Sequence, residues 1–466
     1  MSLYEVSGEP AEGSLLAFHK TETKITRPEW AKLGCVDAAA QISVGVKDIL
    51  AVVYDSDETA LLLYADAARA AIDTSKPSGS TLRALVLAQS SWASLKQHVP
   101  SELIHELSSS TAPVHLVVNP SASQGRARVI AERIVVSLLR ALGRQSQVHI
   151  TQSAAQIKDE LAPALLRLGE HTQILVCGGD GTMSELLNGL AAQPIRNVSL
   201  ELATLPVGTA NAFDAWLHPP EQLQKYHPRL FAGLLDLVTL RHKPVALTMA
   251  KSVISPSGST QYAHVVVSFA LHASILHDAE KMRQQHPGID RFKLAAMQNV
   301  TEWHAGTLEI KGQDIQLYSP ASKSFTSCDG PVTLDGPFLY LASSLIDRFE
   351  PTFIVDPLRR DAPAGTIDLV LMRPSQSGHD ISNASKTTRE MVAGTMGKVF
   401  EAMYNGGKHI DSPHVEIYRC TTFTFTPRDQ TSEKHGLVCN DGTLEKIPAG
   451  GSVTVTTHAF PSIEIY

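Results

Sequence analysis

Three short apolar runs, each followed by a loop of small residues and then by a helical pattern, constrain the fold of this chain most strongly. The runs cover residues 114–118, 174–177 and 202–205, and their loops begin at Asn119, Gly178 and Pro206. Three strand-loop-helix units in about a hundred residues predict a parallel α/β sheet. Because the carboxyl ends of parallel strands meet at one edge, where such sheets bind ligands, all three loops are expected at that edge.

The remaining sequence predicts two further, β-rich regions. With 466 residues the chain should form two or three domains, since a domain averages roughly 150 residues. Apolar runs at 49–54 and 60–65 flank a polar turn at 55–58, which predicts a hairpin within a small module over residues 1–112. The serine-rich segment 108–113 marks the boundary to the α/β domain, predicted over 113–245. Residues 246–466 are predicted to form a β-rich second domain, with another hairpin pattern around a turn at 255–258.

Composition and charge exclude several classes of protein. The net charge of −7 argues against a nucleic-acid partner, because phosphate neutralisation needs a basic surface. The five cysteines (Cys35, Cys177, Cys328, Cys420 and Cys439) show no C-x-x-C spacing, so neither a disulfide framework nor a structural zinc site is expected. The N-terminus lacks a leader pattern and no apolar run approaches the length of a membrane span. We therefore expect a cytoplasmic protein that contacts membranes only peripherally.

The loop Gly178-Gly179-Asp180-Gly181-Thr182 carries the most chemical information. Its glycines let backbone N–H groups approach a ligand closely, as a phosphate chain at a helix N-terminus requires. Among them, Asp180 could face a transferred phosphate and accept a hydroxyl proton or help to position a metal. The alternative is a glycine-rich turn in which Asp180 is an ordinary helix N-cap.

Two other loops have matching character. The first runs from Asn119 and Pro120 through Ser121 to Gly125, and the second contains Gly208, Thr209 and Asn211. Both combine small residues with an amide side chain before a helix start, which suits nucleotide phosphates or ribose, although capped turns are the alternative. Neither the G-x-x-x-x-G-K-[S/T] phosphate loop nor the G-x-G-x-x-G fingerprint occurs in this region.

The order and spacing of these loops resemble the catalytic domain of the diacylglycerol kinase and sphingosine kinase superfamily. The resemblance covers about residues 113–458 and rests on Asn119-Pro120, on the loop 178–182 followed by Glu185 and Asn188, and on the loop 206–211. Three segments of the second half, at 280–283 with 291–292, at 365–370 and at 407–409, look most like the sphingoid long-chain-base kinases. Residues 1–112 would then be a regulatory or membrane-associating module.

The resemblance implies an ATP-dependent lipid kinase, a phosphotransferase that uses Mg²⁺ and phosphorylates the primary hydroxyl of a sphingoid long-chain base. It implies a β-sandwich-like, lipid-binding second domain and an active site between the two domains, with Asp180 as the base. Nucleotide contacts are implied for Asn119, Pro120, Ser121, Gly125, Thr151, Gly178, Gly179, Gly181, Thr182, Glu185, Gly208, Thr209, Asn211, Arg283, Arg291, Asp441 and Gly442. Asp441 is also the implied metal ligand, and the arginines would stabilise charge on the phosphoryl group.

Two departures from the family pattern affect these expectations. Near the C-terminal end the family carries Asp-Gly-Glu, whereas this chain has Asp441-Gly442-Thr443 and so lacks the second acid. The Asp that holds the lipid head group in sphingosine kinases is also missing, and Asp278, two positions away, is the candidate by proximity. A hydrophobic slot for the lipid is expected in the second domain, with Leu271 and Leu294 as candidate linings.

Several alternatives remain open at this level. The lipid acceptor could instead be diacylglycerol or ceramide, NAD kinases share a Gly-Gly-Asp-Gly loop, and Thr443 would also suit a catalytically silent binder of lipid or nucleotide. A homodimer is one alternative for the oligomeric state. His264, His272 and His277 match no metal-binding spacing, so they are expected to be ordinary core or surface histidines.

Overall fold

The computed structural model describes most of the chain after residue 112 and separate strands before it. The described residues are 2–6, 15–24, 41–45, 49–54, 60–65, 82–87, 99, 104–107, 110, 112–169, 171–194, 198–223, 229–239, 243–286, 288 and 290–466. Cys35 and the polar turn predicted at 55–58 lie outside them.

The first region is a seven-stranded sheet. Its strands are β1 (Ser2–Val6), β2 (Leu15–Lys24), β3 (Gln41–Gly45), β4 (Ile49–Tyr54), β5 (Ala60–Ala65), β6 (Leu82–Leu87) and β7 (Ile104–Glu106), in the order β3-β2-β1-β6-β5-β4-β7. Strands β4 and β5 pair antiparallel, with Tyr54 opposite Ala60, as the sequence predicted.

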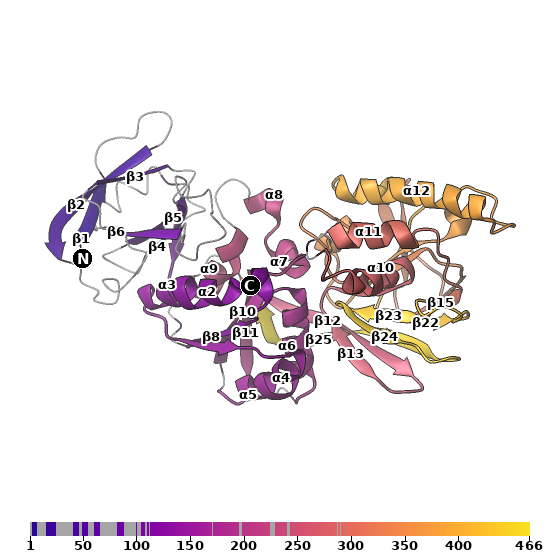
Figure 1. Cartoon of the computed structure of the whole chain (residues 1–466), viewed down its shortest axis with the longest axis horizontal. Helices are drawn as coiled ribbons and strands as arrows, with labels where there is room; N and C mark the ends of the chain where they lie inside the picture. Colours follow the sequence, from indigo (N-terminus) through magenta and orange to yellow (C-terminus); the bar gives the residue numbers. More distant parts are fainter. Residues whose placement is uncertain are drawn as a thin grey trace.

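A parallel four-stranded sheet follows, as the alternating pattern predicted (Figure 1). Its strands β8 (Val114–Val118), β9 (Ser146–Ile150), β10 (His171–Gly178) and β11 (Ser199–Pro206) lie in the order β11-β10-β8-β9. Its helices are η5 (Ala122–Gly125), α2 (Ala127–Val129), the π-helix η6 (Ile130–Val135), α3 (Val136–Ala141), α4 (Ala154–Gln156), the π-helix η7 (Ile157–Leu161), α5 (Ala162–Leu166), α6 (Asp180–Ala191), α7 (Ala212–Leu217), α8 (Pro220–Leu223), η8 (Arg229–Phe231) and α9 (Ala232–Val238).

Alternate residues of the central strand β10 belong to two different cores. Ile174 and Val176 pack in one cluster with residues of α5 and α6, whereas Leu175 and Cys177 pack in another with residues of α3 and α9. Since successive side chains of a strand point to opposite faces, helices cover both faces of the sheet. The central strands β8, β10 and β11 are therefore mostly buried, and their loops remain at the sheet edge.

The remainder of the chain forms two antiparallel sheets. Strands β12 (Val245–Ser255), β13 (Thr260–Ala263), β15 (Gly306–Lys311), β18 (Val332–Asp335), β22 (Thr422–Pro427) and β25 (Ser452–Ile465) belong to one sheet. The other consists of β14 (Val266–Phe269), β16 (Gln316–Ser319), β17 (Ser324–Ser327), β19 (Tyr340–Ser344), β20 (Ile367–Met372), β21 (Glu416–Cys420), β23 (Leu437–Asn440) and β24 (Thr443–Lys446).

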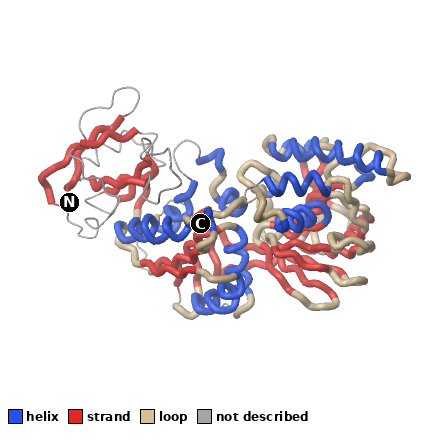
Figure 2. Tube along the Cα trace, in the orientation of Figure 1, coloured by secondary structure: helices blue, strands red, loops and turns tan. Residues whose placement is uncertain are grey.

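These two sheets face each other, as expected for a β-sandwich. Residues of both, including Leu308 and Phe423 from one sheet and Leu341 and Leu369 from the other, share one buried cluster. The outer face of the second sheet carries the helices α10 (Ala270–Lys281), α11 (Asp290–Asn299) and α12 (Lys386–Tyr404), as Figure 2 shows for the right-hand part of the molecule. Short 3-10 helices η9 (Pro357–Asp361), η10 (Pro374–Gln376) and η11 (Lys408–Asp411) lie in the connections.

The long last strand joins the two units. Along most of its length β25 pairs antiparallel with β12, from Ser452 opposite Ser255 to Ile465 opposite Val245. Its final residues also pair in parallel with β11, where Ile463 lies opposite Leu200. The parallel sheet and one sheet of the sandwich are thus one continuous sheet, and the C-terminus lies within the α/β unit (Figure 1).

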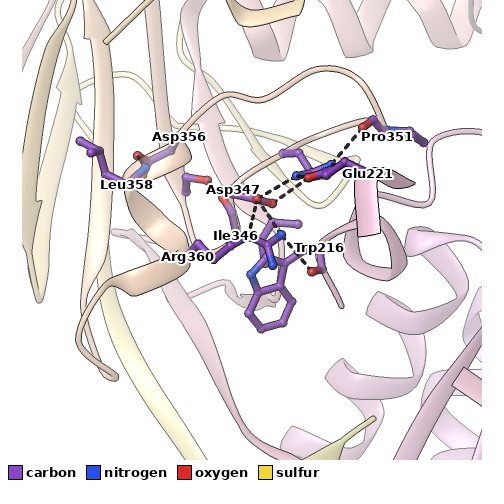
Figure 3. A network of polar contacts seen from close by, with 10 residues as sticks. Trp216, Glu221, Ile346, Asp347, Pro351, Asp356, Leu358 and Arg360 are labelled. Atoms are coloured by element: carbon purple, nitrogen blue, oxygen red, sulfur yellow. Dashed lines mark hydrogen bonds and ion pairs between the residues drawn. The ribbon is translucent and has the colours of Figure 1, made fainter. Parts of the chain in front are cut away.

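A polar network makes a second connection between the units (Figure 3). Buried Arg348 donates two hydrogen bonds to Glu221 of α8, at 2.6 and 3.0 Å, and two to the buried carboxylate of Asp347. Arg360 bonds Asp347 at 2.8 Å and the carbonyl oxygen of Trp216 at 3.2 Å. Charged, bidentate contacts of this kind are directional, so they help to fix the orientation of α7 and α8 against the sandwich.

Candidate active site

Four loops meet at the carboxyl edge of the parallel sheet. They follow β8 at Asn119, β9 at Thr151, β10 at Gly179 and β11 at Val207, and the strand order places neighbouring loops side by side. The topology therefore brings together three motifs that lie up to 89 residues apart, between Asn119 and Gly208, in the sequence. The predicted convergence of the loops is confirmed.

Two of the loops touch at their glycines. A Cβ added to Gly208 would lie 2.4 Å from the Cα of Gly179 and 2.7 Å from Asn211 Oδ1, and a Cβ on Gly179 would lie 2.9 Å from the Cα of Gly208. No side chain fits between these backbones. This close approach explains why both positions are glycine.

Amide and hydroxyl side chains tie the loops together. Asn119 Nδ2 donates to Thr182 Oγ1 at 3.0 Å, which joins the loop after β8 to helix α6. Asn211, in the left-handed conformation with φ 50°, accepts the Gly208 N–H at 2.9 Å through Oδ1. Thr151 is buried and its hydroxyl donates to the Val118 carbonyl. The loops thus form one preorganised polar surface.

Asp180 begins helix α6 but does not cap it. Its Oδ2 accepts the Ala212 N–H and its Oδ1 the Phe213 N–H, both at 2.9 Å, so the carboxylate binds the first turn of α7 instead. The alternative that Asp180 caps its own helix is therefore wrong; its carboxylate accepts the first two N–H groups of α7, whose N-cap residue is Asn211. The loops after β10 and β11 touch at Gly179 and Gly208, and the hydrogen bonds of Asp180 add a second connection between them.

The environment of Asp180 favours protonation. Burial raises the pKa of this carboxyl above its usual value; the two backbone hydrogen bonds and the charge of His264 act against this, and the charge of Asp441 adds to it. A carboxylate has about four acceptor positions, and the hydrogen bonds from described residues occupy two of them. Since Asp180 is only partly buried, it retains the capacity to accept a proton from a bound hydroxyl.

Asp441 is held quite differently. Oδ2 accepts the backbone N–H of His264 at 2.7 Å and contacts its Nδ1 at 2.6 Å, while Oδ1 accepts the N–H groups of Val265 at 3.0 Å and Val266 at 2.9 Å. The side chain is fully buried. Asp441 and Gly442 form the two-residue turn between β23 and β24, both with positive φ, as Asp-Gly hairpin turns do.

This geometry does not fit the predicted metal ligand. Four donors of the protein surround the two oxygens of Asp441, so no acceptor position remains for Mg²⁺. Among the residues described by the structure, no group of three or more His, Cys, Asp or Glu side chains is arranged to hold a metal ion. The expectation that Asp441 binds magnesium directly is therefore corrected.

The predicted arginines lie around the turn between α10 and α11. Arg283 forms an exposed ion pair with Glu280 at 2.7 Å, and buried Arg291 donates to the Gly288 carbonyl at 2.7 Å. The charge of Arg283, after burial, contributes to lowering the pKa of Arg291, so the two cations are near each other. The structure thus brings the two predicted arginines close to each other at this turn.

The residues predicted to contact the lipid separate into three settings. Asp278 accepts Asn299 Nδ2 at 2.7 Å, contacts His277 Nδ1 at 3.0 Å and lies 3.5 Å from Lys434 Nζ. Burial alone would raise the pKa of Asp278, but these partners lower it. Leu271 is buried in the main core cluster, whereas Leu294 is 37% exposed on α11. The core position of Leu271 does not support a slot-lining role.

Most of the other residues predicted to contact the nucleotide lie at or near the carboxyl edge of the parallel sheet. Pro120, Ser121 and Gly125 lie in the loop after β8, where Gly125 has φ 86°. Gly178 ends β10, and Gly181 and Thr209 are exposed. Glu185 lies one turn beyond Thr182 on α6, where burial raises its pKa. Gly442, by contrast, lies in the hairpin turn of the sandwich.

Two contacts between the units were missed by sequence reasoning. Asn188 of α6 accepts the Tyr262 N–H at 2.9 Å and donates to the Tyr262 carbonyl at 2.8 Å, so its side chain pairs with a strand of the sandwich. His264, expected to be an ordinary core or surface histidine, bonds Asp441 and contacts the Phe213 ring edge-on, with 4.7 Å between ring centroids. The Asp-Gly hairpin signal at 441–442 could have indicated the turn, but not its partner.

Comparison with known proteins finds similarity in the α/β unit. Residues 113–240 match the family model described as "Diacylglycerol kinase catalytic domain". The chain is 29% identical over 110 residues to the diacylglycerol kinase of Staphylococcus carnosus (strain TM300), covering 24% of this chain and 34% of that one. It is 31% identical over 108 residues to the diacylglycerol kinase of Staphylococcus haemolyticus (strain JCSC1435), covering 23% and 31%.

Other similarities cover a larger share of the chain. Human ceramide kinase is 21% identical over 243 residues, covering 48% of this chain and 42% of that protein. The chain thus spans about a third of the length of the staphylococcal relatives and less than half of the human one. A crystal structure of a diacylglycerol kinase from Bacillus anthracis str. Sterne aligns with TM-score 0.47 at 16% identity, over 77% of this chain and 97% of that one. Within the described part of the chain, no helix has the length and apolarity to cross a membrane.

Proposed function

We propose that this protein is an ATP-dependent lipid kinase that transfers the γ-phosphoryl group to a lipid hydroxyl. The observation that carries the proposal is the position of Asp180, a partly buried carboxylate with spare acceptor capacity among three phosphate-suited loops. The family match of residues 113–240 supports it. The reaction needs a positioned phosphate chain and a group that takes one proton, and this edge offers both.

In the proposed step, the hydroxyl oxygen of the lipid attacks the γ-phosphorus and gives its proton to Asp180. The bond between the γ-phosphorus and the bridging oxygen breaks, and ADP leaves with that electron pair. Backbone N–H groups at the start of α6 and in the loop that follows Gly208 would bind the phosphates, because glycine there allows close approach; the Gly208 N–H itself is donated to Asn211 Oδ1. Asp441 does not fit Mg²⁺, so the step is assigned to Asp180 and the loops alone.

For the acceptor, we propose a sphingoid long-chain base, phosphorylated on its primary hydroxyl. The segments at 280–283, 365–370 and 407–409 support this choice. Arg283 and Arg291 are proposed to reach the phosphates from the second unit. Ceramide is the second candidate, because similarity to human ceramide kinase extends over 243 residues and therefore beyond the catalytic domain.

The lipid has to reach the edge from a membrane surface, and α11 offers an apolar contact. Leu294 and Met297 are 37% and 77% exposed on this helix, next to Lys293. Exposed apolar side chains beside a cation suit the interface of an anionic bilayer. We propose peripheral membrane contact through this helix.

The test is transfer of labelled γ-phosphate from ATP to sphingosine, dihydrosphingosine, phytosphingosine, ceramide, diacylglycerol and NAD, with Asp180→Asn as control. Product on the long-chain bases, lost in the variant, is expected. Product on ceramide or diacylglycerol alone would contradict the proposed sphingoid acceptor but would support the proposed lipid kinase activity. Product on NAD alone, or ATP binding without product, would overturn the lipid kinase in favour of an NAD kinase or a silent binder.

A further inference from the structure

We propose that His264, oriented by Asp441, is a further residue of the reaction centre, whose Nε2 donates a hydrogen bond to the γ-phosphate of bound ATP. This inference rests on the proposed function. It adds a residue from the sandwich to a site otherwise built from loops of the parallel sheet, and it gives the buried Asp441 an orienting role.

The orientation of the ring is fixed from one side. His264 is 1% exposed, and its Nδ1 lies 2.6 Å from Asp441 Oδ2. The same carboxylate binds the backbone N–H of His264, Val265 and Val266, so carboxylate and ring are anchored to one stretch of backbone. The hydrogen bond between this carboxylate and Nδ1 fixes the orientation of the ring and the hydrogen-bonding role of the opposite nitrogen, Nε2.

The opposite nitrogen, Nε2, is buried and has no hydrogen-bond partner among the described residues. A buried polar atom without a partner is costly and calls for an explanation such as a ligand. A phosphate oxygen is an acceptor that would satisfy a ring N–H at this position.

The location of the ring points to the reaction centre. It packs edge-on with the Phe213 ring, and the backbone N–H of Phe213 is one of the two that hold Asp180. The charges of His264 and Asp180 act on each other. Asp180 is proposed to face the lipid hydroxyl and the γ-phosphate, so a neighbouring imidazole is well placed to contact the same phosphate.

Other buried histidines differ in this respect. His409 is as buried as His264, and its Nε2 contacts the Val355 carbonyl at 2.8 Å while Nδ1 has no partner among the described residues. Burial lowers its pKa to about 4, and a neutral ring that donates Nε2–H to a carbonyl carries no proton on Nδ1, so Nδ1 has no hydrogen to donate. For His264, burial acts in the same direction, but the charge and hydrogen bond of Asp441 outweigh it and raise the pKa. His409 is therefore a matched control.

Two variants distinguish the contribution of Nδ1 from that of Nε2. In His264→Asn the side-chain amide reaches the place of Nδ1 and can still bond Asp441, but Nε2 is lost. In His264→Gln the longer side chain brings its amide nitrogen to the place of Nε2, and the bond to Asp441 is lost. His409→Gln is the control. We would measure kcat and KM for ATP with the best lipid acceptor, and Kd for ATP and for ADP by calorimetry.

If Nε2 binds the γ-phosphate, His264→Asn should lower kcat/KM for ATP by about 10- to 100-fold and weaken ATP but not ADP, because a hydrogen bond to a charged group is lost. His264→Gln should retain more activity than His264→Asn. The reverse order, or equal weakening of ATP and ADP, would show that His264 only holds Asp441 and would overturn the proposal. A wild-type protein without lipid kinase activity would refute the proposed function, and unchanged ATP affinity in His264→Asn would separately refute this inference.

Discussion

Two aspartates, one in each unit, are held by backbone N–H groups in contrasting ways. At the carboxyl edge of the parallel sheet, Asp180 accepts two N–H groups from the first turn of α7 and remains partly exposed. In the hairpin turn of the sandwich, Asp441 accepts three N–H groups, contacts an imidazole and is fully buried. Each carboxylate has about four acceptor positions, so only Asp180 has capacity left for a substrate.

The difference follows from the architecture around each residue. A parallel strand ends at a helix N-terminus, and the next loop can approach only from one side, which leaves room for a ligand. The two-residue hairpin turn at Asp441 faces the bend between β13 and β14, whose residues 264–266 supply donors to both oxygens. An aspartate followed by glycine can therefore keep acceptor capacity in one region and serve as an internal support in the other.

The largest effect is expected for Asp180→Asn. Loss of the proton acceptor should lower kcat by about 100- to 10,000-fold, the usual contribution of a general base. Steady-state phosphotransfer measures this effect. Circular dichroism and ADP binding should remain close to wild type, and turnover within threefold of wild type would contradict the assignment of Asp180.

Asp441→Ala should act on stability first. The change leaves three buried N–H groups and His264 without their acceptor, which should lower the free energy of unfolding by about 3 kcal/mol or more. Urea denaturation measures the loss. Asp335→Ala, which removes an exposed ion pair with Arg428, is the control and should cost at most about 1 kcal/mol. An equal loss of unfolding free energy in the two variants would argue against a supporting role of Asp441.

Individual buried histidines should respond to pH in opposite directions, and His218 of the α/β unit is the first case. Burial lowers the pKa of His218, but hydrogen bonds and charges of Asp214 and Asp236 raise it to about 9 overall. Because a raised pKa stabilises the folded protein below the unfolded value of about 6.5, this stability, about 3 kcal/mol, should be lost as the pH rises from about 6.5 to 9. Denaturation of wild type and His218→Gln across this range tests the slope, which should be absent in the variant.

In the sandwich, burial lowers the pKa of His304 to about 3 and of His409 to about 4; nearby cationic groups add to the shift at His304 and backbone hydrogen bonds oppose it at His409. A lowered pKa contributes stability above about pH 6.5 that is lost as the pH falls through the folded value. Acid titration of His409→Gln should therefore show a shallower loss than wild type. An unchanged acid slope would contradict this part of the comparison.

Gly208→Ala tests how tightly the loops approach each other. The new Cβ would lie 2.4 Å from the Gly179 Cα, so the loops must separate at a cost of about 1–3 kcal/mol. The KM for ATP should rise, and thermal unfolding should shift downward. Gly397→Ala, in α12 with nothing within 4 Å of the new Cβ, should instead be neutral or slightly stabilising. Tolerance at Gly208 equal to that at Gly397 would exclude the close contact.

The smallest effect on folding is expected for Arg283→Ala. Its exposed ion pair with Glu280 contributes at most about 1 kcal/mol to stability. If Arg283 reaches the phosphates of bound ATP, the KM for ATP should rise a few-fold in this variant without a change in the free energy of unfolding. No change in either quantity would remove Arg283 from the nucleotide site.

The sequence predicted the α/β unit well because its signals are local and its topology is restrictive. Each motif follows a buried strand. Parallel pairing places the carboxyl ends of β8, β10 and β11 at one edge of the sheet, independently of how the helices pack. The sandwich residues were less predictable. Whether Leu271 lines a slot or packs in the core depends on elements far away in the sequence, and it packs in the core.

The partners of Asp441 illustrate the same limit. The hairpin turn of Asp441 could be predicted from the Asp-Gly pair, but the donors at 264–266 lie at the bend before β14, about 175 residues earlier in the chain. No periodicity connects the two segments. His264 therefore looked like an ordinary histidine until its neighbours were known.

The most direct test of this account is a crystal structure with a non-hydrolysable ATP analogue. We expect the phosphates on the N–H groups of residues 178–182 and 208–211, with the γ-phosphate beside Asp180 and Asp441 still bound to its three backbone N–H groups. Phosphates bound elsewhere, or a metal ion held directly by Asp441, would contradict the division of roles between the two aspartates.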